Sequence, residues 1–263
     1  MAAPLAGVRV IEMGQLIAIP WATKMLGDMG AQVIRLESCA RLESYRTDAL
    51  FENAVDGEFW NRGGNFYEHN RNKLGITLDL GQPEGLSILR ELISIADVFV
   101  ENFTPRVIKN FDLEYEALRK IKPDIIMVSS TGYGFTGPWA NFGATGPATE
   151  GASGLAFMTG YRDGPPVMSE IPYTDYSSSE HTVFAIMAAL MHQLGTGQGQ
   201  FVDISQTQAS SATVPEALMD FSANGRTAPR TGIEDSAMAP HGCYPCAGQD
   251  RWITIAVATD AQW

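Results

Sequence analysis

Residues 8–36 read VRVIEMGQLIAIPWATKMLGDMGAQVIRL, and this segment contains a complete β-α-β pattern. The β-branched run at Val8–Glu12 is typical of a strand. Pro20 is suited to open a helix, because its missing N–H needs no partner in a first helical turn. Apolar residues then recur on one helical face as far as Met29, and Gly30 is placed to end the helix. A second strand is predicted at Gln32–Leu36.

The same alternation continues along the chain and predicts an α/β fold with a mostly parallel sheet. Further strands are predicted at Gly75–Leu80, Val98–Glu101, Ile125–Ser130 and Phe201–Ile204. Helices are predicted from Pro83 to Ala96, around Val107, at Tyr115–Ile121 and at 176–194. Residues 38–69 show no clear period, so we expect a long irregular excursion there. The expected architecture is Rossmann-like.

The composition is that of an ordinary globular protein with an excess of acidic residues. The formal net charge of −12 argues against a broad nucleic-acid surface, and any anionic ligand then requires a local basic pocket. The three cysteines, Cys39, Cys243 and Cys246, are too few for a disulfide framework and favour a reducing compartment. The C-x-x-C pair lacks further ligands, so no metal is expected. No basic start followed by a sustained apolar run is present, and the expected location is cytoplasmic.

The loop at 131–147 holds five glycines and follows the carboxyl end of a predicted strand. Ligands of open α/β sheets bind at such ends. No G-x-G-x-x-G opens the first helix, and no phosphate-loop lysine motif occurs in the chain. A standard dinucleotide or ATP site is therefore not supported.

Asp175 lies where the polar segment 171–181 runs into an apolar helical pattern. A carboxylate at a helix start is expected to stay ionised, because free backbone N–H groups and the helix dipole favour its charge. An ionised, fixed carboxylate can act as a nucleophile. The alternative role for an Asp at such a position is simple helix capping.

Eight segments occur in an order that is recognisable as a whole. They are Leu5–Glu12, Met29–Glu37, Asn70–Leu80, Ala96–Phe103, Ser130–Pro138, Asp163–Val167, Gly195–Ser205 and Trp252–Val257. Together they resemble the class III CoA-transferase family, which includes formyl-CoA and carnitine CoA-transferases. The resemblance covers essentially the whole chain. It implies acyl-CoA and a free carboxylic acid as substrates, and no metal.

The resemblance places Asp175 at the position of the family's catalytic aspartate. A carboxylate there attacks the thioester carbonyl, expels CoA thiolate and forms a mixed anhydride. The thiolate then attacks the aspartyl carbonyl, and the incoming acid takes CoA from the resulting enzyme thioester. Water must be excluded, because hydrolysis would waste the thioester bond.

The resemblance also implies a CoA-binding surface along the loop after the first strand. Leu16, Ile17 and Ala18 carry over from the family by position, and backbone N–H groups of this loop are expected to receive a developing oxyanion. Further CoA contacts are expected from Leu78, Asn102 and Phe103. Cations close to these loops are candidate phosphate ligands, namely Arg71, Lys73, Arg106 and Lys109. The alternative for these residues is packing at the sheet end or solvated surface charge.

Two departures from the family pattern bear on function. Ser38 follows Glu37 where members often carry a basic residue, so Arg35 or Arg41 is expected to substitute. Residues 143–146 lack the His that the related α-methylacyl-CoA racemases use, which disfavours a racemase unless His181 stands in for the missing base. A non-catalytic CoA-binding subunit of a heteromeric transferase is the third alternative.

Family membership also implies a domain organisation. Residues 1–222 are expected to form a large Rossmann-like CoA-binding domain, and 223–263 the beginning of a smaller α+β domain that family chains continue further. Family members form interlocked dimers, here with a second copy or a homologous subunit. The acceptor acid stays open. Tyr161, Arg162, Trp60 and Tyr67 are candidates for its pocket.

Overall fold

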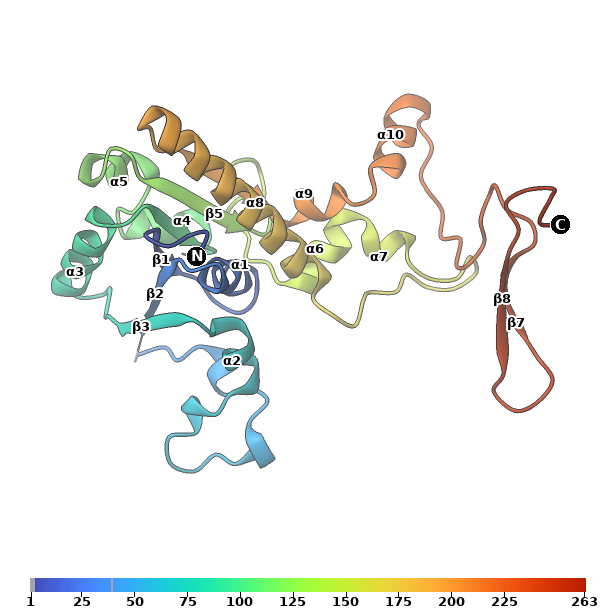
Figure 1. Ribbon diagram of the computed structural model, residues 1–263, viewed down its shortest axis with the longest axis horizontal. Coiled ribbons are helices and arrows are strands. Elements are labelled where there is room, and N and C mark those ends of the chain that lie inside the picture. The colour runs from blue at the N-terminus through green and yellow to red at the C-terminus, as the bar shows by residue number, and fades with distance from the viewer. Residues whose placement is uncertain (1–2, 39) are drawn as a thin grey trace.

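The computed structural model describes residues 3–38 and 40–263 and centres on one parallel sheet (Figure 1). The six strands lie in the order β3-β2-β1-β4-β5-β6, which confirms the expected Rossmann-like α/β architecture. Their bounds are β1 Arg9–Met13, β2 Gln32–Glu37, β3 Lys73–Thr77, β4 Val98–Glu101, β5 Ile126–Thr131 and β6 Phe201–Ser205. The chain runs outward from β1 to β3 and then returns to place β4 beside β1. Strand order therefore reverses between β1 and β4.

Helices cover both faces of the sheet, because alternate strand residues point to opposite sides. On one face, valines such as Val10 and Val100 pack with α1 (Ala18–Asp28) and α8 (Tyr173–Thr196). On the other face, residues such as Phe99 pack with the remaining crossover helices. Those are α3 Pro83–Ser94, α4 Pro105–Asn110 and α5 Tyr115–Ile121. The two apolar clusters explain why the central strands read as continuous apolar runs.

Most predicted elements are confirmed, with shifts at their ends. Helix α1 begins at Ala18, two residues before Pro20, and β3 begins at Lys73 and ends at Thr77 rather than spanning Gly75–Leu80. The excursion at 38–69 contains three short 3₁₀ turns and the start of α2 (Gly64–Asn70), a helix that the sequence pattern did not reveal. Polar and aromatic residues interrupt any apolar stripe in that helix. Cys39 lies outside the described residues.

The segment after β5 leads through α6 (Gly146–Ser153) and α7 (Leu155–Met158) to the long helix α8. After β6 come α9 (Gln206–Ser211) and α10 (Pro215–Asn224). The chain ends in an antiparallel hairpin of β7 (His241–Pro245) and β8 (Trp252–Ala256), which forms its own two-stranded sheet. Figure 1 shows this hairpin at the opposite end of the molecule from the parallel sheet.

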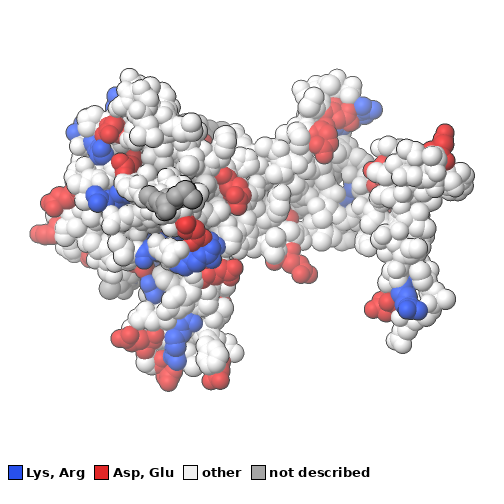
Figure 2. Space-filling model, viewed as in Figure 1, with Lys and Arg blue, Asp and Glu red and all other residues white. Residues whose placement is uncertain are grey.

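Two kinds of feature are absent from the described residues. No helix among them is both long and apolar enough to cross a membrane. Within 3–38 and 40–263, no group of three or more His, Cys, Asp or Glu side chains is arranged to hold a metal ion. Figure 2 shows acidic side chains spread over much of the visible face, with basic ones in small groups.

Candidate active site

A cleft of about 490 Å³ opens at the carboxyl ends of the strands, where strand order reverses. The loop after β1 lines it with residues 15–17, and the loop after β4 with Asn102–Thr104. The glycine-rich loop after β5 contributes Gly143–Pro147, and Tyr45 comes from the excursion. Ligand sites of doubly wound sheets form at this reversal, because adjacent loops diverge there.

Asp175 lines this cleft from the first turn of α8. Its side chain is half-buried and does not cap the helix. Gln206 donates from Nε2 to Oδ1 across 3.4 Å, a long hydrogen bond. Gly146 lies against the other carboxylate oxygen, so closely that a Cβ at position 146 would overlap Oδ2. The capping alternative therefore fails, and the carboxylate faces the cleft.

Burial raises the pKa of Asp175 to about 6, and the hydrogen bond from Gln206 only partly opposes that rise. The pKa is raised, although a helix start was expected to favour the charged form, because lost hydration contributes most. At pH 7 the group is still mostly ionised. It is a more basic carboxylate than an exposed one.

Hydroxyl groups fix the backbone around Asp175. Ser178 donates to the Asp175 carbonyl at 2.9 Å, and Ser179 lies 2.6 Å from the carbonyl of Ala18 and 2.7 Å from that of Asp175. Thr174 is buried and lies 3.0 Å from the carbonyl of Gly146. These contacts join the starts of α1, α6 and α8 around one carboxylate. The run Ser177-Ser-Ser179 was the available signal for them in the sequence.

The loop after β1 is held on both sides. Asn102 accepts the Gln15 N–H at Oδ1 and donates from Nδ2 to the Gln15 carbonyl, both at 2.9 Å. Glu43 accepts the Leu16 N–H at 2.8 Å, and Leu16 adopts a left-handed φ of 61°. Two backbone donors expected to be free for an oxyanion are thus already engaged. Ile17 lines the cleft next in the chain, and Ala18 is buried at the start of α1.

A second cavity of about 410 Å³ adjoins the cleft and shares four lining residues with it: Gln15, Arg41, Phe103 and Val107. Leu78 lines this second cavity just after β3, and Phe103 lines both. Arg41 is exposed and is the one cation that lines the cleft in the described part of the chain. The structure thus brings together Asp175, the loop after β1, Asn102, Phe103 and Leu78.

The other predicted cations lie elsewhere. Arg71 is exposed and pairs with Asp28 at 2.5 Å. Lys73 is buried, and its ammonium contacts Glu12 at 2.9 Å and the Pro20 carbonyl at 2.9 Å. Burial lowers the pKa of Lys73 to about 8, although Glu12 opposes this. Neither residue lines the cleft or the adjoining cavity.

Arg106 and Lys109 are exposed on α4 and line neither cavity. Val107, on the same helix, lines both cavities. Arg35 and Arg41 were expected to substitute for the basic residue that family members often carry after Glu37. Arg35 is buried between Glu12 and Glu43. The exposed substitute is Arg41.

Other titratable groups in the cleft are few. Burial raises the pKa of Tyr45 to about 12, so its hydroxyl stays a hydrogen-bond donor at neutral pH. No His or Lys is among the described residues that line the cleft. His181 is exposed on α8, where Nδ1 lies 2.8 Å from the Ser177 carbonyl, and it does not line the cleft.

The candidates for an acceptor pocket do not meet at the cleft. Tyr161 and Arg162 lie in the segment between α7 and α8, where Arg162 pairs with Glu234. Trp60 lines a separate cavity near Arg46, and the Tyr67 hydroxyl donates to the Asn61 carbonyl at 2.7 Å. None of the four lines the cleft that holds Asp175.

Known proteins resemble the chain over its whole length. A succinate–glutarate CoA-transferase of Agrobacterium fabrum is 36% identical over 99% of the chain and 64% of its own length. Succinyl-CoA:glutarate CoA-transferase of Mus musculus is 32% identical over 99% of the chain and 58% of its own length. A CAIB/BAIF family protein from Brucella suis has a similar structure, with a TM-score of 0.85, 30% identity, and coverage of 99% of this chain and 68% of that one.

The chain thus spans about three fifths of the length of these curated relatives. The model of CoA-transferase family III matches residues 5–263. The resemblance seen in the sequence motifs is confirmed, and this chain belongs to CoA-transferase family III.

Proposed function

We propose that the protein carrying this chain transfers CoA from an acyl-CoA thioester to a free carboxylic acid, with Asp175 as the covalent carrier. The observation that carries the proposal is a half-buried carboxylate in a cleft at the strand-order reversal. The described residues that line this cleft include no His or Lys. A carboxylate without a neighbouring base suits nucleophilic attack better than proton shuttling.

The proposed reaction balances in four steps. The Asp175 carboxylate attacks the thioester carbonyl, and the C–S bond breaks to give a mixed anhydride and CoA thiolate. The thiolate attacks the aspartyl carbonyl and releases the donor acid, leaving CoA on Asp175. The acceptor carboxylate attacks that thioester and frees the thiolate again. The thiolate finally attacks the acceptor acyl carbon, which yields the new acyl-CoA and restores the Asp175 carboxylate.

The environment of Asp175 supports this role. A carboxyl with a pKa near 6 is ionised at neutral pH yet more nucleophilic than an exposed aspartate. Gln206 and the hydroxyl of Tyr45 are polar groups near the reacting centre. Partial burial of the carboxylate also limits access of water, which would hydrolyse either anhydride or thioester.

The two adjoining cavities together suit an elongated ligand such as acyl-CoA. In the proposed pose the thioester lies beside Asp175 and the nucleotide end lies in the second cavity, against Leu78 and Phe103. Arg41 lines both cavities and is proposed to contact a phosphate, with Arg106 and Lys109 available on the exposed face of α4. Arg71 and Lys73 are no longer favoured as phosphate ligands, because both have anionic partners.

The relatives suggest the class of acid. The Agrobacterium fabrum and Mus musculus relatives are named for succinate, succinyl-CoA and glutarate. We therefore propose short dicarboxylic acids and their CoA thioesters as substrates. Chloroflexus aurantiacus relatives are named as alpha and beta subunits of a succinyl-CoA–L-malate CoA-transferase. These names fit assembly with a homologous subunit. We propose an interlocked dimer, as the family resemblance implies, with a second copy or a homologous subunit.

The remaining parts of the proposal concern organisation. Residues 1–222 are proposed to form the CoA-binding domain and 223–263 the beginning of a smaller domain, in line with the separate β7–β8 sheet. A cytoplasmic location belongs to the same proposal. The position of His181 outside the cleft favours the transferase over the racemase alternative.

The test is intact-protein mass spectrometry on the full-length protein incubated with a panel of acyl-CoAs. Hydroxylamine is added to trap activated carboxylates, and wild type is compared with Asp175→Ala. We expect a hydroxamate on the peptide that contains Asp175, absent from the variant. CoA binding without any adduct would refute covalent transfer and favour a non-catalytic subunit. Solvent deuterium entering the α-carbon of the acyl group would instead support a racemase.

A further inference from the structure

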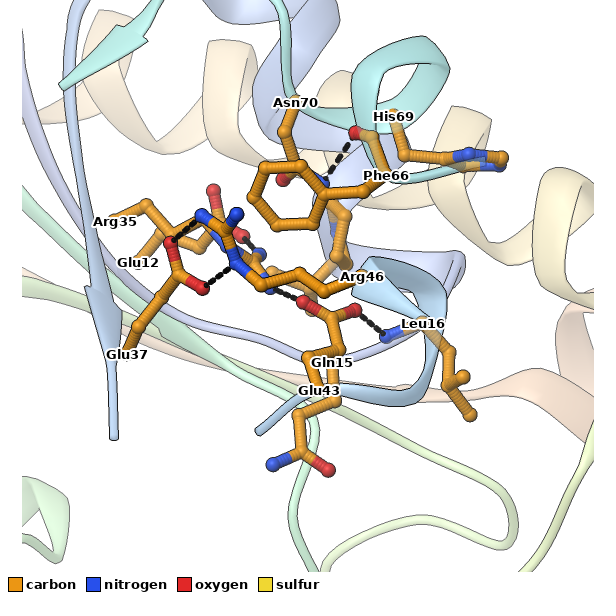
Figure 3. A network of polar contacts seen from close by, with 12 residues as sticks. Glu12, Gln15, Leu16, Arg35, Glu37, Glu43, Arg46, Phe66, His69 and Asn70 are labelled. Atoms are coloured by element: carbon orange, nitrogen blue, oxygen red, sulfur yellow. Dashed lines mark hydrogen bonds and ion pairs between the residues drawn. The ribbon is translucent and has the colours of Figure 1, made fainter. Parts of the chain in front are cut away.

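Charged side chains from separate segments meet beneath the loop after β1 (Figure 3). Glu12 on β1, Arg35 on β2 and Glu43 in the excursion are 0%, 2% and 8% exposed. Lys73 on β3 completes the cluster through its contact with Glu12. Two carboxylates and two cations make the cluster neutral, as a group of charges removed from water must be.

Arg35 joins the two carboxylates. One terminal nitrogen of its guanidinium pairs with Glu12 and the other with Glu43. A guanidinium presents its donors in a rigid fork, so the two carboxylates are held in a fixed relation. Thr23 adds a 2.7 Å hydrogen bond to Glu12, which ties that carboxylate to helix α1. Glu43 is thus anchored to the core of the sheet, although it comes from an irregular segment.

The second oxygen of Glu43 accepts the N–H of Leu16. Leu16 is the residue of the loop with a left-handed φ, a conformation that a side chain with a Cβ rarely adopts. Gln15 is fixed independently, because Asn102 satisfies both its N–H and its carbonyl. Glu43 is therefore the side-chain partner of the Leu16 N–H at the point where the loop enters Ile17 and α1.

We propose that Glu43 is a positioning residue for the CoA-transfer site. Its carboxylate, oriented by Arg35, holds Leu16 in the left-handed conformation and so sets the cleft wall formed by Leu16 and Ile17. Glu43 does not line the cleft that holds Asp175, although it lines the adjoining cavity. The inference rests on the proposed function, because it assigns the cleft as the place where thioester and Asp175 meet.

Two variants of the full-length protein separate positioning from charge balance. Glu43→Gln and Glu43→Ala each remove one negative charge and leave the cluster with the same positive excess. Glutamine retains one acceptor oxygen, for which the Leu16 N–H and the Arg35 guanidinium compete, whereas alanine retains none. Asp56→Asn serves as the matched control, because it weakens an exposed ion pair with Arg62 in the same excursion.

The first readout is hydrogen exchange of single backbone amides, measured without substrate by mass spectrometry with fragmentation. We expect the Leu16 amide to exchange about 10-fold or more faster in Glu43→Ala than in wild type and at an intermediate rate in Glu43→Gln, while the Gln15 amide stays equally protected in all three. The second readout is the rate of hydroxamate formation on Asp175. It should fall about 10- to 100-fold further in Glu43→Ala than in Glu43→Gln, with CoA binding changed less.

Exchange of the Leu16 amide in Glu43→Ala as slow as in wild type would overturn the proposal. If Glu43→Ala fails to fold, Glu43→Asp replaces it, because the shorter side chain keeps the charge but cannot reach both Arg35 and Leu16. Leu16 protection in Glu43→Asp equal to wild type would then overturn the proposal. Full transfer activity in Asp175→Ala would refute the proposed function instead, and the exchange measurement would still decide the role of Glu43.

Discussion

The contact between Gly146 and Asp175 gives a sharp test of the proposed site. Gly146 begins α6, and a Cβ added there would overlap Oδ2 of Asp175 and stand 3.2 Å from Cβ of Pro172 and 3.6 Å from Cγ of Asp175. The carboxylate must then move by roughly 1 Å to restore van der Waals separation. Gly146→Ala should therefore displace the nucleophile without changing its chemistry.

A displacement of about 1 Å from a productive geometry costs on the order of 10²-fold in rate. We expect Gly146→Ala to slow hydroxamate formation on Asp175 by about that factor, with CoA affinity changed by less than about threefold. Overpacking should lower the free energy of unfolding by about 1–3 kcal/mol, partly offset by the better helix propensity of alanine. Stopped reactions analysed by mass spectrometry give the rate, and calorimetric titration gives the affinity.

The same helix offers a matched control. A Cβ at Gly151 meets no atom within 4 Å. Gly151→Ala should raise the free energy of unfolding by about 0.5–1 kcal/mol and leave the rate unchanged. If Gly146→Ala reacts as fast as Gly151→Ala, the carboxylate does not act from the position described here, and the reasoning fails.

Four further predictions concern charge and burial. The rate of adduct formation should fall as pH drops through about 6, because protonated Asp175 is not nucleophilic, and the pH–rate profile of single-turnover reactions measures this. The same raised pKa means that folding favours the protonated form of Asp175. Asp175→Asn should therefore stabilise the protein by about 1–2 kcal/mol at pH 8, after allowance for partial exposure, and should have no such effect below pH 4. Thermal melts at the two pH values test the sign. Arg41→Gln should raise KM for acyl-CoA about 10-fold with kcat nearly unchanged. Arg62→Gln, in the same excursion, should alter neither constant. An equal effect of both variants would exclude a specific role for Arg41. Lys73→Ala should cost about 3–5 kcal/mol of stability in chemical denaturation, because it leaves a buried carboxylate without its ammonium, and a cost below about 1 kcal/mol would contradict the buried pairing.

Local periodicity predicted most of the fold. Tyr115–Ile121 and Val98–Glu101 have the bounds expected from the sequence, because the helix and strand periods follow from local backbone geometry. The short helix Gly64–Asn70 escaped detection, since its polar and aromatic residues carry no apolar stripe. The loop positions Leu16 and Ile17, and Asp175 itself, were found through motifs and are placed together at the cleft.

Charge partners were decided by tertiary structure. Lys73 was a candidate phosphate ligand, and Arg35 a candidate substitute for the basic residue missing after Glu37. The sheet instead sets Arg35 directly beside Glu12 in the register of β1 and β2 and brings Lys73 in on β3. Which strands become neighbours depends on contacts far apart in sequence, which local pattern does not encode.

The same distinction applies to Asp175. The sequence by itself determined that a carboxylate begins a long helix after a polar turn, and the motifs determined the family. Only the tertiary structure decided that Gly146, Gln206 and Tyr45 gather around the cleft that holds the carboxylate. Burial by these segments, which are distant along the chain, removes hydration and raises the pKa of Asp175.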